Sequence, residues 1–203
     1  CVTQAQCYFA MTDEGVLRLS DLVLNTPFSD LSATAEVDMS LFDKNPDAPL
    51  RMLAQAHLSC RDIAYIYPDA SQYYIHTTRD RSLLPIHDVI SVNIDIDGIA
   101  QDIVVDKFNL SQMGVFSLDT RARLSNPLDE KKRNVSVSCA FRSSGHFSLE
   151  NFVPDTLLAQ HLVAQPIKAY INAGVSGSDV EADAKLQCMG GDILADAVYN
   201  LNS

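Results

Sequence analysis

One stretch of the sequence places oxygen-bearing side chains at the spacing of a calcium-binding loop. In residues 93–98 (Asn-Ile-Asp-Ile-Asp-Gly), amide and carboxylate groups alternate and glycine takes the sixth place. The twelfth place, where such loops need a bidentate carboxylate, is Val104. The alternating isoleucines instead predict a half-buried strand that ends in an Asp97-Gly98 hairpin turn. We therefore expect a hairpin and no metal site, with weak calcium binding at Asp95 and Asp97 as the alternative.

Residues suited to nucleophilic catalysis are present but scattered. Residues 174–178 (Gly-Val-Ser-Gly-Ser) resemble a nucleophile elbow, but Ser178 stands where the motif needs its second glycine. The five histidines form no HExxH or HxH motif, and no glycine-rich loop could hold a phosphate group. The sequence therefore predicts a non-enzymatic protein without a cofactor. Catalytic triads are defined by geometry, so an enzyme with a site assembled from distant His, Asp and Ser residues is an alternative.

The tyrosines gather in one segment of the chain. Four of the seven surround residues 68–72, where we expect a hairpin; they are Tyr65, Tyr67, Tyr73 and Tyr74. Tyrosine offers a large and rigid contact area, and it is enriched in protein interfaces. We therefore take these four residues as candidates for binding a protein partner. The alternative is that the rings cover a sheet edge.

The five cysteines indicate an oxidising compartment. Cys1 stands first, as the acylated cysteine does in mature bacterial lipoproteins, so we expect it to carry a lipid; a chance boundary is the alternative. The other four lie on the apolar side of alternating segments, which predicts that they point into a core. We expect the disulfides Cys7–Cys60 and Cys139–Cys188, although four cysteines allow three pairings and buried free thiols are the alternative.

The charge of the chain restricts its partners. The formal net charge is −11, and the fifteen lysines and arginines are dispersed along the sequence. Binding to nucleic acid or to an anionic membrane surface needs a concentrated basic face. We therefore expect no nucleic-acid partner, and membrane contact only through a lipid on Cys1.

Apolar and polar residues alternate along most of the sequence. This period of two is typical of antiparallel strands with one face on a core and one in water. The segments with the clearest alternation are 5–11, 35–41, 52–60, 92–97, 116–124, 134–141 and 180–188. Helix signals are limited to two short segments near the C-terminus, one beginning at Asp155 and one at Asp192.

A faint repeat divides these strands into two related groups. Gly15, Asn25, Asn45 and Cys60 recur as Gly98, Asn109, Asn126 and Cys139, at offsets of 83, 84, 81 and 79 residues. A repeat of this length indicates a duplicated β unit. We therefore expect a mainly β, antiparallel protein with a first module in residues 1–84 and a second in residues 85–203. The modules would be two β-sandwiches, or the two halves of one sandwich.

These patterns predict an exported protein of a cell envelope, in the bacterial periplasm, at the outer membrane or on the cell surface. The leading function is non-enzymatic binding or assembly with a protein partner, with Cys1 as the lipid attachment point. A surface adhesin or receptor-binding protein that uses the tyrosine segment is the second expectation. An enzyme assembled from scattered residues is the third.

Overall fold

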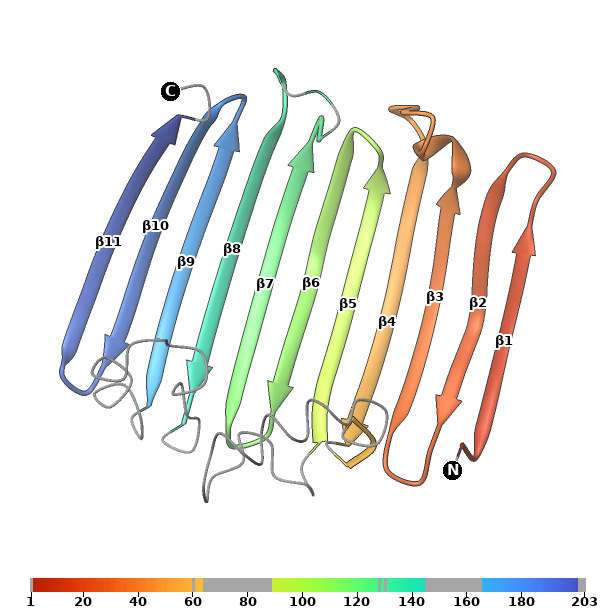
Figure 1. The fold of residues 1–203 in the computed structure, drawn as a ribbon, viewed down its shortest axis with the longest axis horizontal. Helices are drawn as coiled ribbons and strands as arrows, with labels where there is room; N and C mark the ends of the chain where they lie inside the picture. The colour runs from red at the N-terminus through yellow and green to blue at the C-terminus, as the bar shows by residue number, and fades with distance from the viewer. Residues whose placement is uncertain are drawn as a thin grey trace.

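The protein is built around one open antiparallel sheet. The computed structural model describes residues 2–59, 61–63, 89–127, 129, 131–144 and 166–200. Within these residues, eleven strands lie side by side in the order of the sequence (Figure 1). The strands are β1 Gln4–Met11, β2 Val16–Asn25, β3 Asp30–Asp38, β4 Pro49–Ser59, β5 Val89–Ile99, β6 Asp102–Gln112, β7 Phe116–Ser125, β8 Asn134–Ser143, β9 Ile167–Ser176, β10 Asp179–Cys188 and β11 Gly191–Asn200.

The register of the strands sorts apolar and polar side chains onto opposite faces. Directly paired residues in neighbouring strands share a face, and successive residues in one strand alternate between faces. We call one side of the sheet the apolar face, and its central row runs unbroken from β2 to β11: Leu22, Ala33, Ala54, Ile94, Phe108, Thr120, Cys139, Ile171, Ala184 and Ala195. We call the other side the polar face, and one of its rows reads Asp30, His57, Ser91, Ser111 and Ser117.

The repeat seen in the sequence corresponds to two groups of four strands. Its first copy covers β1–β4 and its second covers β5–β8. Both groups have a bulge at the same place: Ser20 and Asp21 interrupt the pairing of β2 with β3, and Asp106 and Lys107 interrupt the pairing of β6 with β7. Bulges are retained features of a strand because they set its bend and twist. Duplication of a four-stranded unit stays a prediction, because Gly15 lies in the β1–β2 turn whereas Gly98 lies within β5.

The mainly β, antiparallel class predicted from the sequence is confirmed, but its finer arrangement differs. Two separate sandwiches are not seen in the described residues, because β4 and β5 pair directly along their whole length, from Pro49 with Ile99 to Ser59 with Val89. The expected last helix is wrong, because the residues after Asp192 form β11 and pair with β10. The 84/85 boundary and the helix expected from Asp155 lie outside the described residues.

The turn between β5 and β6 also differs from expectation. Asp97 and Gly98 belong to β5, and the chain reverses at Ala100 and Gln101. Gly98 adopts a φ of 142°, and a Cβ atom there would overlap the backbone oxygen of Asp102 and lie 3.1 Å from the Ile103 Cα atom. The glycine is therefore required by the close approach of β6.

The described residues contain very little core. Their buried apolar side chains are Ala48, Ala56, Ile90, Ala100 and Ile167. A β-sheet with one apolar face normally buries that face against a second layer. Within the described residues, no second layer covers the apolar face (Figure 1). No helix among them is long and apolar enough to cross a membrane.

The backbone at Gly98 provides a test of the β5–β6 pairing. Gly98→Ala combines an unfavourable φ with overlap of the facing strand, so we expect a loss of about 3 kcal/mol in the free energy of unfolding. Gly114→Ala is the control, because Gly114 also has a positive φ of 73° but nothing lies within 4 Å of the added methyl group. It should lose about 1 kcal/mol. Equal urea midpoints for the two variants would contradict the close approach of β6.

Candidate functional site

The apolar face is the most extensive feature of the molecule that has no partner in the described residues. Its paired positions hold no Asp, Glu, Lys, Arg or His in the described strands, because every charged residue with a strand partner lies on the polar face. At its edges, large side chains are open to solvent: Phe9 in β1 is 67% exposed and Ile193 in β11 is 57% exposed. Exposed apolar patches rimmed by polar residues mark interaction sites.

Strand β11 is apolar on both of its sides. Ile193 pairs with Leu186 on the apolar face, whereas Leu194 pairs with Lys185 on the polar face. Leu194 is nevertheless 72% exposed, and Val198, also on the polar face, is exposed as well. The edge strands also lack the lysines and prolines that commonly block edge-to-edge pairing, since β1 contains no charged residue at all. The C-terminal edge is therefore a second exposed surface.

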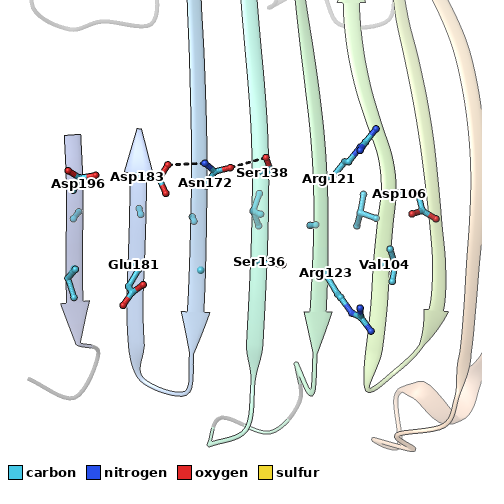
Figure 2. Close-up of a pocket in the computed structure, with 18 residues that line it drawn as sticks. Val104, Asp106, Arg121, Arg123, Ser136, Ser138, Asn172, Glu181, Asp183 and Asp196 are labelled. Atoms are coloured by element: carbon cyan, nitrogen blue, oxygen red, sulfur yellow. Dashed lines mark hydrogen bonds between the residues drawn. The ribbon is translucent and has the colours of Figure 1, made fainter. Parts of the chain in front are cut away.

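A groove crosses the polar face over strands β6–β11 (Figure 2). Its volume is about 780 Å³, and its lining consists of three consecutive rows of paired residues. The two outer rows belong to the polar face and form the walls. The middle row belongs to the apolar face, so its backbone forms the floor: Val105, Ala122, Val137, Ala173, Ala182 and Ala197.

The groove carries charges of both signs, and its β6–β7 end holds Asp106 as well as two arginines (Figure 2). Arg121 and Arg123 lie on β7, and three carboxylates lie on β10 and β11: Glu181, Asp183 and Asp196 (Figure 2). Between them, the Ser138 hydroxyl donates to Asn172 Oδ1 at 2.9 Å, and Asn172 Nδ2 donates to Asp183 at 2.8 Å. This polar row spans β8, β9 and β10. The arrangement suits an extended ligand with complementary charges, but it contains no nucleophile with an adjacent base.

An ion pair holds one end of the groove in place. The Arg123 guanidinium donates to the two oxygens of Asp102 at 3.0 and 2.7 Å, and the Ser125 hydroxyl donates to Asp102 at 3.1 Å. The hydrogen bond from Arg123, and after it the one from Ser125, holds the pKa of Asp102 below its ordinary value. Asp102 in turn raises the pKa of Arg123. The bidentate contact fixes the direction of Arg123.

The arrangement closest to a catalytic one is the row Asp30, His57 and Ser91. His57 Nδ1 lies 3.0 Å from an Asp30 oxygen, and Ser91 stands directly opposite His57 on β5. A hydrolytic site also needs a hydrogen bond from the hydroxyl to the base and an oxyanion hole. His57 makes no hydrogen bond with Ser91, and the backbone of β4 and β5 is paired in the ladder around them. The sequence could not reveal this row because its members come from three strands.

The residues predicted from the sequence have different outcomes. Cys7, Cys139 and Cys188 are free thiols in the structure, so both predicted disulfides, Cys7–Cys60 and Cys139–Cys188, are wrong. Cys7 is exposed, so the expectation that it points into a core is also wrong. Cys139 pairs with Ile171, whereas Cys188 lies four residues along β10 from Ala184, the partner of Ile171. The Cα atoms of Cys139 and Cys188 are therefore about 16 Å apart. This distance is far beyond the reach of a disulfide. The remaining predicted residues lie outside the described ones: Cys1, Cys60, Tyr65, Tyr67, Tyr73 and Tyr74.

The oxygen-rich segment of β5 does not gather into a metal site. Asp97 faces Arg51, with 3.8 Å between the charged atoms, and Asp95 stands opposite Lys107. In the described part of the chain, no group of three or more His, Cys, Asp or Glu side chains is placed to hold a metal ion. This segment therefore forms a strand, and its carboxylates lie opposite Arg51 and Lys107.

Comparisons with known proteins give no relative. No protein-family model, no curated protein and no solved structure matches this chain. The function must therefore be argued from the chemistry of the two faces.

The Asp30–His57–Ser91 row gives a direct test of hydrolase chemistry. A fluorophosphonate probe labels serines that are activated by a base. We expect no covalent labelling of Ser91, because its hydroxyl is not bonded to His57. Labelling mapped to Ser91, and lost in both Ser91→Ala and His57→Ala, would contradict this expectation and establish an enzyme.

The Asp102–Arg123 pair predicts a dependence of stability on pH. The pKa of Asp102 is lower in the folded protein than in the unfolded chain. Its contribution to the free energy of unfolding is therefore complete above the unfolded pKa of about 4, and it is lost as the pH falls through the lower folded pKa. The difference in urea midpoint between wild type and Asp102→Asn should therefore shrink between pH 6 and pH 2. Asp13→Asn, in the β1–β2 turn, is the control. A difference that stays constant with pH would contradict the assignment.

Proposed function

We propose that this protein is a non-enzymatic binding or assembly component of the cell envelope, and that its apolar face is the surface on which a protein partner packs. The observation that carries the proposal is the continuous apolar face, which crosses all eleven strands and has no covering layer in the described residues. A surface of this kind needs a partner, and it offers no groups for chemistry.

The size of the face supports a partner rather than a chance patch. The sheet has eleven strands separated by ten gaps of about 4.8 Å, and each strand has about ten residues at 3.4 Å per residue. The area of the face is therefore roughly 1,600 Å². The largest apolar patch on an ordinary monomer is about 300–600 Å². A standard protein interface takes about 800 Å² from each partner. The face is therefore large enough for a permanent interface.

The charge distribution supports a protein partner over a nucleic acid. The net charge is −11. On the polar face, several cations are already paired across strands with carboxylates, as in Arg18 with Glu36 and Lys185 with Asp192. A phosphate backbone would meet repulsion from the net charge and few unpaired cations.

The compartment stays a prediction from the sequence, since Cys7, Cys139 and Cys188 are free thiols and add no support to it. The sandwich arrangement expected from the sequence fits the same proposal, because a second sheet from a partner would complete it.

Methionine oxidation tests whether the apolar face is covered in the cell. Met11 lies on the apolar face and is 63% exposed in the sheet, while Met113 and Met189 lie in turns and are 96% and 81% exposed. With a partner in place, Met11 should be oxidised at least about five-fold more slowly than the two turn methionines in intact envelopes, because a partner removes most of its exposed area. All three should react alike in urea.

Equal oxidation rates of Met11, Met113 and Met189 in intact envelopes would overturn the proposal. Met52, in the interior of the same face, serves as a second reporter. Its rate in envelopes should also fall below its rate in urea.

A further inference from the structure

We infer that the partner on the apolar face is a second copy of this chain, packed face to face so that two eleven-stranded sheets form one sandwich. This inference rests on the proposed function, because it names the protein that covers the same face. Three properties of the face point to self-association: its area, its lack of charge and the distribution of large and small side chains across it.

The accessible surface of the chain is too large for a compact monomer. A folded monomer of 22.3 kDa exposes about 9,400 Å². This chain exposes 13,295 Å², which leaves an excess of about 3,900 Å² by the same relation. Burial of the apolar face removes at most about 1,600 Å² from each copy, since Ile90 and Ile167 at one end of it are already buried. The total falls in the range of obligate homodimers, whose interfaces resemble a core divided between two chains.

The charges of two copies do not oppose this contact. Each chain carries −11, so most other contacts between copies would bring acidic surfaces together. In the face-to-face arrangement the paired charged residues of both sheets point outward. At its paired positions the contact holds apolar and uncharged polar side chains only. The separation of charge from the apolar face therefore suits a second copy.

One row of the face is complementary to itself in shape. Its β1–β4 half carries Phe9, Leu19, Ala35 and Met52, whereas its β9–β11 half carries only alanines, at 173, 182 and 197; the next row ends in Val175, Val180 and Tyr199. A two-fold axis parallel to the strands places the bulky half of each sheet over the small half of the other. Isologous contacts of this type close the assembly at two chains.

Neighbouring residues on opposite faces provide matched variants for the test. In β11, Ile193 lies on the apolar face and Leu194 on the polar face, and both are mostly exposed in the single sheet. In β1, Phe9 and Tyr8 form the same kind of pair, with exposed fractions of 67% and 59%. Because all four are exposed at the edges of the sheet, an aspartate at any of them disturbs no packing within one sheet.

The experiment is sedimentation of the purified full-length protein at micromolar concentration, with circular dichroism to confirm the strands of each variant. We expect wild type to have twice the mass of one chain. Ile193→Asp and Phe9→Asp should weaken the dimer about 10-fold, since each places a charge against the apolar face of the other copy at the rim of the contact. Leu194→Asp and Tyr8→Asp should remain dimeric.

The outcomes separate this inference from the proposed function. A purified monomer whose Met11 is protected only in intact envelopes overturns the second copy but leaves a different protein partner. A monomer whose Met11 is reactive in both samples overturns both proposals. A monomer whose Met11 is protected in the purified state shows that the chain covers its own face, and it also overturns both. A dimer broken equally by Ile193→Asp and Leu194→Asp indicates edge pairing and overturns the face-to-face contact.

Discussion

The need to keep water off one face of the sheet is the constraint on which the rest of this structure depends. Alternation places apolar side chains on one side of every strand, and direct pairing aligns them into rows that cross the sheet, such as the row from Leu22 to Ala195. The hydrogen-bonded ladder satisfies the backbone, but it gives those side chains contact only with their neighbours in the plane. The main stabilising term in folding is removal of apolar area from water, and a single layer leaves that term incomplete.

The polar face has a different role in this account. Its cross-strand pairs, such as Arg123 with Asp102, lie in solvent, where such pairs add little stability. They set the register of neighbouring strands and position the side chains that line the groove over β6–β11. The groove and the Asp30–His57 pair are therefore consequences of strand pairing, whereas the apolar face is the feature that requires another surface.

Much of the fold could be predicted from alternation alone, because period two identifies a strand and its apolar side. It does not give distance: Cys139 and Cys188 share a face, yet two strand spacings and four residues separate them. The last strand was predicted as a helix because Asp192 can cap one and Ile193, Leu194, Ala197 and Val198 also fit one helical side. These residues form a strand because they pair with β10. The Asp30–His57–Ser91 row and the groove depend on cross-strand register, which no local pattern contains.

The central claim is that a second copy of the chain covers the apolar face in the purified native protein. The most direct measurement is the fluorescence of an apolar-surface dye such as anilinonaphthalene sulfonate, added to native wild type and to Ile193→Asp at micromolar concentration. The account predicts almost no enhancement with wild type and a strong enhancement with the variant, whose strands remain intact but whose face is open. Strong enhancement with the native wild-type protein, at full strand content, would contradict the claim.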